Sequence, residues 1–465
     1  MADLSKLIKP DWLEITDEFE KAYDTVTTEN GVFFITGSAG SGKSTFLKLL
    51  LSNMKLGSYV VLSPTGVAAN NLRTDGIECE TIHSYFGFPP KPLFPCNIHK
   101  PNENSLEKYA IPETLVIDEI SMVSSLMLSA IDEFYRKALN IDEFFGGKRL
   151  ILVGDLYQLP PVISDKSEMD YIRHTFGSKY FYSAKPFEFV PITTINFTRI
   201  FRQKDEKFIS FLNSIKYGTI TRSQLNEHNQ IMVHNEIKDD AIVLCTYNKD
   251  VEYYNNKKLD EISSKPITLV GKVEGNFNVK QCAVDEVIKI KIGARVMIRS
   301  NDRESGQYIN GTVGKLINFD GELMDVELDS GCIVSIGKVE FHSEKYEFDK
   351  SSNEVRSMGT GKFIQYPISI GYAMSIHKSQ SCTIEEYVID TGERGIFDTG
   401  QTYVALSRCT KLSGIKLKRP LGISEVMVDN AVMEFMSNVN KNDVKEYKKE
   451  SDGFGGIFNN INGQF

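Results

Sequence analysis

The chain has 465 residues, of which 41% are hydrophobic and 25% charged, as in an ordinary globular protein large enough for two or more domains. Its net charge of −9 counts mildly against nucleic-acid binding, although an acidic average still allows a local basic groove. The seven cysteines are scattered and never spaced C-x-x-C, which argues against disulfides or a zinc site and favours a reducing compartment. No apolar run reaches membrane-spanning length and no signal h-region is present, so we expect a cytoplasmic protein without a membrane partner.

The residues before Gly31 have the apolar spacing of one amphipathic helix, with Leu13, Phe19, Ala22 and Tyr23 on its buried face. A buried strand, Val32–Ile35, should follow this helix.

A glycine-rich loop comes next, between this strand and a segment of helical apolar spacing. Its sequence, GSAGSGKS, fits the phosphate-binding pattern G-x-x-x-x-G-K-[ST]. Glycines let successive backbone N–H groups surround an anion, and the helix N-terminus adds partial positive charge. We predict that ATP binds here, with Lys43 on the β- and γ-phosphates and the Ser44 hydroxyl on Mg²⁺. The expected nucleotide-binding residues are Gly37, Ser38, Ala39, Gly40, Ser41, Gly42, Lys43, Ser44 and Thr45.

Three further apolar runs predict parallel strands whose carboxyl ends carry polar groups: Tyr59–Ser63, Thr114–Glu119 and Leu150–Val153. The second ends in Asp118 and Glu119, which suit a Mg²⁺ ligand and a group that orients the attacking water. The third leads to GDLYQLPP, where Gln158 could sense a γ-phosphate; a proline-stiffened turn is the alternative.

Five prolines crowd the segment that follows Thr81–Phe86, which excludes a regular helix or central strand there. We expect a small protruding insertion at residues 84–112, or else a plain surface loop.

The second half begins with a strand at Ala241–Leu244 and then changes texture. Short β-rich runs at Val287–Ile298, Gly311–Phe319, Leu323–Leu328 and Cys332–Ile336 predict a small antiparallel barrel. The Gly/Asn-rich tail at residues 447–465 is expected to be disordered.

The motifs taken together resemble those of a superfamily-one DNA helicase, and in particular the petite-integration-frequency (PIF-like) helicases of the 5′-to-3′ branch, which are related to RecD. They are GSAGSGKST, PTGVAANNL, TIHSYFGF, LVIDEIS, FFGG with RLILVGDLYQLPPV, TRIFRQ, IGYAMSIHKSQS and QTYVALSR, in the family's order from residue 31 to 409. Three features depart from the family pattern. Phe19 stands where an adenine-reading Gln is usual, Ser381 replaces a Gly, and long extensions are missing, as in near-minimal bacterial or phage motors rather than nuclear ones.

The resemblance implies an α/β fold with two RecA-like P-loop domains. The first would span residues 1–83 and 113–200, with a wedge at 84–112. The second would span 201–262 and 366–438, with an SH3-like β-barrel insertion at 263–365 and a tail at 439–465. Arg202, on the interdomain linker, and Arg408 would be arginine fingers, with structural ion pairs as the alternative.

By the same resemblance, Thr65, His83, Asn248, His377 and Ser379 would lie near a bound strand. Phe86 and Phe88 are further candidates for base stacking, or else core residues. The implied activity is ATP- and Mg²⁺-dependent 5′-to-3′ translocation on single-stranded DNA, with unwinding of duplexes, forks, RNA–DNA hybrids and G-quadruplexes. A monomer working with a single-strand-binding protein is implied. The alternatives are a translocase or clamp that does not unwind, a nucleotide-switched binding protein and, with less support, a nuclease-helicase.

Overall fold

The computed structural model describes residues 15–439 except 56, 67, 70–71, 73–76, 90–91, 96–97, 164, 235, 238–240, 276, 278, 280–281, 283, 301, 303–306, 309–311, 350–353 and 381. The side chains of residue 104 and residues 342–360 are also left undescribed. The expectations for Leu13, Ser381 and the tail therefore lie outside the described residues. Among the helices of the described part, none has the length and apolar character needed to cross a membrane.

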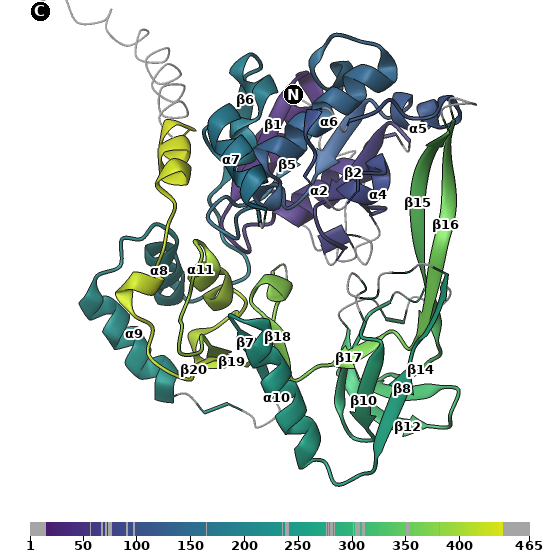
Figure 1. The fold of residues 1–465 in the computed structure, drawn as a ribbon. Coiled ribbons are helices and arrows are strands. Elements are labelled where there is room, and N and C mark those ends of the chain that lie inside the picture. Colours follow the sequence, from purple (N-terminus) through teal and green to yellow (C-terminus); the bar gives the residue numbers. More distant parts are fainter. Residues whose placement is uncertain are drawn as a thin grey trace, which may run out of the picture.

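The first domain is built on a six-stranded parallel sheet (Figure 1). Its strand order is β3 (Glu80–Thr81), β2 (Tyr59–Ser63), β4 (Thr114–Ile117), β5 (Arg149–Val153), β1 (Val32–Gly37) and β6 (Ile192–Phe197). The four predicted strands of this half are confirmed. All six residues of β1 are buried, since helices cover both faces of a parallel sheet.

Side chains of β1 alternate between two cores. Phe33 and Ile35 pack with α1 (Asp17–Thr28) and α2 (Lys43–Ser52), whereas Val32 and Phe34 pack with α6 (Ser125–Leu139). The first helix is confirmed: the Thr16 hydroxyl caps it by accepting a hydrogen bond from the Phe19 N–H at 3.3 Å, and Phe19, Ala22 and Tyr23 are buried. A further helix, α7 (Lys166–Thr175), follows β5.

The 84–112 segment is anchored to the first domain. It contains the end of α4 (Ile82–Phe86), a 3₁₀ turn at Glu103–Ser105 and α5 (Leu106–Ala110). Phe88, Leu93, Ile98 and Tyr109 are buried in the same core as α6. The Lys137 ammonium of α6 also donates to the carbonyl oxygen of Ile98 at 2.8 Å.

The second domain has a four-stranded parallel sheet, ordered β18 (Ala373–Ser375), β7 (Ile242–Cys245), β19 (Tyr387–Asp390) and β20 (Ile415–Leu417). Its helices are α8 (Glu206–Lys216), α9 (Arg222–His234), α10 (Asn248–Glu261) and α11 (Gln401–Leu406). This second parallel sheet with its own core agrees with the two-domain RecA-like fold expected from the motifs.

The insertion between α10 and β18 is β-rich, as predicted. Its five-stranded antiparallel sheet runs β14 (Ile333–Ile336), β13 (Met324–Leu328), β12 (Val313–Phe319), β11 (Arg295–Ile298) and β17 (Ile368–Ile370). β10 (Val287–Lys291) pairs with β8 (Pro266–Val270), and β9 (Lys272–Gly275) pairs with β16 (Glu354–Gln365). The sequence reading missed the long hairpin of β15 (Val339–Asp349) and β16, which extends away from the insertion (Figure 1).

The chain returns to the first domain at its end. Residues 430–439 are helical, and Val432 and Met436 join the core of α6. The Phe435 ring stacks on Tyr182 with centroids 4.1 Å apart, and the Tyr180 hydroxyl donates to Asp429 at 2.9 Å. Residues 429–436, which the sequence assigns to the second domain, thus pack on the first, because local periodicity does not say which core an apolar helix face will meet.

Candidate active site at the domain interface

The P-loop connects the end of β1 to the start of α2, and its glycines are sterically required. A Cβ on Gly37 would lie 2.5 Å from the Ser41 hydroxyl oxygen, and one on Gly40 would lie 2.4 Å from the Arg202 Cβ. Gly42, just before α2, has a φ of 87°, which favours glycine. Gly37 and Gly40 are therefore required because neighbouring atoms leave no room for a side chain, and Gly42 because of its backbone conformation.

Lys43 opens α2 and folds back over the loop. Its ammonium donates to the carbonyl oxygens of Gly37 at 2.8 Å and Ser38 at 3.0 Å. Burial lowers the pKa of Lys43, with Lys216 adding to the effect and Asp155 opposing it. The Ser41 hydroxyl is buried and has no hydrogen-bond partner among the residues that the structure describes. A phosphate would offer acceptors to both groups, so the loop fits a nucleotide.

Two carboxylates follow β4 at the same edge of the sheet. Burial raises the pKa of Asp118 to about 7, and the neighbouring charge of Glu119 adds to this shift. A divalent cation would favour the charged form, which suits Asp118 and the exposed Ser44 hydroxyl as Mg²⁺ ligands. Glu119 has a φ of 52°, a conformation that costs a non-glycine residue about 1–3 kcal/mol and is often found at functional sites.

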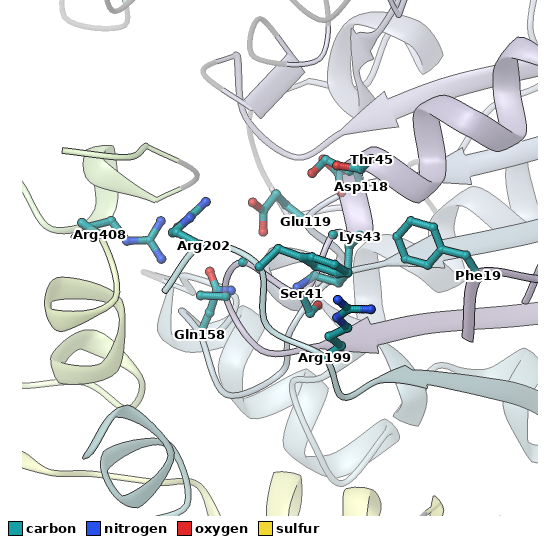
Figure 2. A pocket seen from close by; sticks show the side chains of 16 residues that line it. Phe19, Ser41, Lys43, Thr45, Asp118, Glu119, Gln158, Arg199, Arg202 and Arg408 are labelled. Carbon is teal, nitrogen blue, oxygen red and sulfur yellow. The ribbon is translucent and has the colours of Figure 1, made fainter. Parts of the chain in front are cut away.

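These groups face a cavity of about 520 Å³ between the domains (Figure 2). Arg202 and Arg408 lie on one side, Lys43 and Asp118 on the other, and Glu119 between them. The remaining lining residues are Phe19, Ala39, Gly40, Ser41, Gly42, Ser44, Thr45, Gly154, Gln158, Arg199 and Phe201. Phe19, which stands at the position of the family's glutamine, therefore lines the cavity. The centroids of the Phe19 and Phe201 rings lie 6.4 Å apart.

The two predicted arginine fingers come together at this cavity. Arg202 lies between β6 and α8, the segment that joins the domains, and donates to the Ser407 carbonyl at 3.4 Å. Arg408 is 1% exposed and is held by the Val404 carbonyl at 2.9 Å and the Ser407 hydroxyl at 2.7 Å. Burial and the charge of Arg408 lower the pKa of Arg202 to about 10. The positive charges of Arg202 and Arg408 repel each other, and an anion bound beside them would relieve this repulsion.

A buried ion pair that the sequence reading missed ties the domains together. Lys216, at the end of α8, lies 3.3 Å from Asp155 after β5, with side-chain exposures of 5% and 1%. The same ammonium donates to the Ser38 hydroxyl at 3.0 Å, and the Ala39 N–H donates to the Tyr403 hydroxyl at 2.9 Å. The sequence carried a usable signal: Lys216 follows the apolar residues Phe208, Phe211, Leu212 and Ile215, which recur at helical spacing.

Two glutamines form hydrogen bonds with carboxylates in or beside the candidate site. Gln158 is 7% exposed, and its amide nitrogen donates to Asp155 at 3.4 Å. Gln380, in the second domain, donates from its amide to Glu119 at 3.0 Å. The sequence reading quoted the HKSQ motif but assigned Gln380 no role. The structure shows that it reaches the carboxylate across the cleft.

The predicted strand-binding residues separate into two groups. Thr65, His83, Asn248 and His377 follow the carboxyl ends of β2, β3, β7 and β18 and are partly or fully exposed. Phe86 and Phe88 are only 5% and 8% exposed and belong to the same core as α6. Their rings stack on each other with centroids 5.1 Å apart. The interpretation of Phe86 and Phe88 as base-stacking residues is therefore wrong.

The side chain of Ser379 is also unavailable to a strand. It is fully buried, and its hydroxyl donates to the Ile376 carbonyl at 2.7 Å. For Phe86 and Phe88 the cause is the packing of α6 against them, which the local sequence around these two residues does not show.

Fold and site together define a P-loop nucleotide-binding protein with two RecA-like domains and basic groups reaching across the cleft. Residues 14–226 match the family model described as PIF1-like helicase. The chain is 31% identical to a solved Pif1 helicase from Bacteroides in complex with ADP-AlF3 and ssDNA, with a TM-score of 0.77, covering 92% of this chain and 98% of that one. It belongs to the PIF1-like helicase family, and the resemblance read from the motifs is confirmed.

Two curated relatives differ in how much of their own length the chain matches. The ATP-dependent DNA helicase PIF1 of Homo sapiens is 30% identical over 417 residues, which are 87% of this chain and 60% of that protein. The chain thus spans about 60% of the length of this relative. The ATP-dependent DNA helicase Pif1 of Bdellovibrio bacteriovorus is 27% identical over 91% of this chain and 92% of its own length.

Proposed function

We propose that this protein is an ATP- and Mg²⁺-dependent DNA helicase that moves 5′ to 3′ on single-stranded DNA. One observation carries the proposal: the P-loop, Asp118 and Glu119 of the first domain share one cavity with Arg202 and Arg408. Charge that builds on the γ-phosphate during transfer would be stabilised from both sides only when the cleft is closed. Hydrolysis would then alternate with domain closure and could move a strand.

The proposed roles follow from position. Lys43 binds the β- and γ-phosphates, Ser44 and Asp118 hold Mg²⁺, Glu119 orients the attacking water and Gln158 senses the γ-phosphate. A bound Mg²⁺ would neutralise phosphate charge, while Arg202 and Arg408 act as fingers. For the strand, Thr65, His83, Asn248 and His377 are the proposed contacts.

Substrates and partners are proposed from the family. Solved relatives are described with ssDNA and at forked dsDNA, and one description names two coordinating Pif1 helicases. We propose forks, duplexes, RNA–DNA hybrids and G-quadruplexes as substrates, a single-strand-binding protein as a partner, residues 84–112 as a wedge and a monomer as the basic unit. The rival function is an ATPase that translocates or clamps without unwinding.

Strand separation on two tailed duplexes tests the proposal. One duplex carries a 5′ single-stranded tail and the other a 3′ tail, and each is incubated with ATP and Mg²⁺ beside Lys43→Ala. Unwinding of the 5′-tailed duplex alone supports motor and polarity, whereas unwinding from the 3′ tail alone refutes the polarity. Stimulated ATPase without unwinding on either duplex favours the rival.

A further inference from the structure

An exposed aromatic ring lies at the carboxyl edge of the second-domain sheet. Phe397, in the loop after β19, has 53% of its surface exposed. It is not an isolated apolar side chain: the Tyr247 ring lies 5.3 Å away, and the His377 ring 6.4 Å away with an interplanar angle of 21°. Three π-faces are thus gathered at one surface position.

The three rings come from neighbouring strands. His377 follows β18, Tyr247 follows β7 and Phe397 follows β19, and these strands are adjacent and parallel. Their carboxyl ends therefore meet at one edge, where ligands of open α/β sheets are bound. Tyr247 and His377 are about 130 residues apart in the sequence, and His377 and Phe397 about 20. Only the fold brings the three rings together.

The surroundings of the rings suit a single strand better than a protein surface. The exposed Arg394 places its guanidinium 5.9 Å from the Tyr247 centroid, and Lys378 and Asn248 beside the rings are exposed. Burial lowers the pKa of His377, although Asp398 opposes the shift, so the imidazole is neutral near pH 7. Cations to meet phosphates and uncharged ring faces to meet bases are the combination that single-strand-binding sites use.

The loop that carries Phe397 also touches the nucleotide sensor. Gly400 packs so closely on the first domain that a Cβ there would lie 2.2 Å from the Gln158 carbonyl oxygen. The Phe397 N–H donates to the side-chain oxygen of Gln401 at 3.3 Å, and Gln401 begins α11, which leads to Arg408. A short, hydrogen-bonded loop therefore connects the ring to residues on both sides of the active-site cavity.

We propose that Phe397, together with Tyr247 and His377, forms a base-stacking platform for single-stranded nucleic acid, and that the loop at residues 394–400 links its occupation to Gln158. The proposal rests on the proposed strand-translocating function. Phe397 would take the base-stacking role expected of Phe86 and Phe88, which are buried in the core. Phe397 is exposed, and the sequence motifs did not single it out.

The test compares a normal oligonucleotide with one that has no bases. Binding of oligo-dT and of an abasic strand of equal length is measured by fluorescence anisotropy for the wild type, Phe397→Ala and Phe397→Trp. Phe189→Ala is the matched control, since Phe189 is 67% exposed and lies on the first domain. Thermal unfolding of each variant checks that it is folded.

Phe397→Ala should weaken oligo-dT binding by roughly five- to a hundredfold, the range for loss of one stacked base, and leave abasic binding unchanged. Phe397→Trp should restore oligo-dT binding, and Phe189→Ala should match the wild type. The oligo-dT concentration for half-maximal ATPase stimulation should rise in parallel for Phe397→Ala.

Equal weakening on both strands, or no weakening on either, overturns the platform. These outcomes are distinct from failure of the proposed function, in which the wild type itself would neither bind single strands nor show stimulated ATPase.

Discussion

Replacing Lys216 with methionine removes the buried cation that joins the two domains. The side chain keeps nearly the same length, but Asp155 loses its partner at 3.3 Å and Ser38 loses a donor at 3.0 Å. Burial by itself would lower the pKa of Lys216, yet Asp155 raises it above its usual value, so the ammonium stays charged in the wild type.

The expected loss of unfolding free energy in Lys216→Met follows from the burial of the ion pair. Removing one partner of a fully buried ion pair typically costs about 3–5 kcal/mol, because the other charge is left without compensation. Lys216 and Asp155 lie at an interface between domains, where water can enter once the domains part. We therefore expect a loss near the lower end, about 3 kcal/mol, in the first unfolding transition.

Urea unfolding followed by circular dichroism measures this loss. Lys207→Met is the matched control, because Lys207 is exposed on the same helix. Asp155→Asn and the double variant complete a mutant cycle, for which we expect a coupling of about 1–3 kcal/mol. A coupling below about 0.5 kcal/mol, or equal stability of Lys216→Met and Lys207→Met, would refute the assignment of this pair as an interdomain clamp.

Three other perturbations test separate parts of the site. Arg408→Ala should keep ATP binding but lower strand-stimulated turnover by about a thousandfold or more, as for arginine fingers elsewhere; steady-state kinetics with near-normal turnover would remove it from that role. Asp118→Asn should raise the melting temperature of the nucleotide-free protein much more at pH 8 than at pH 5, with exposed Asp260→Asn as the control. The pKa of Asp118 is about 7 when folded and about 3.9 when unfolded, so the stability gained from its proton is complete below about pH 4 and lost as the pH rises through 7. Equal effects at both pH values contradict this. Oligonucleotide affinity should fall at least about tenfold between roughly 50 and 200 mM salt, and a flat dependence measured by anisotropy would exclude a phosphate-led groove.

The sequence alone determined the strands and the nucleotide cradle. β1, β2, β4 and β5 were readable because each is a short apolar run between polar turns, and a parallel strand is buried on both faces. The P-loop was readable because its chemistry is contained in eight consecutive residues. The β-rich insertion was visible for the same local reason. The β15–β16 hairpin was missed because most of its residues are polar or charged, so neither strand shows a sustained apolar alternation with a period of two.

Only the tertiary structure decided which polar and aromatic side chains face one another. Phe86 and Phe397 are the same residue type, yet α6 covers the first and leaves it 5% exposed, while the second is 53% exposed beside His377. The pairing of Lys216 with Asp155 likewise depends on the fold, because the two residues are about 60 positions apart in the chain and belong to different domains. The burial of a side chain and its pairing with another charge depend on elements that are distant in the sequence. The free energy of these contacts is gained only when the tertiary fold brings those elements together.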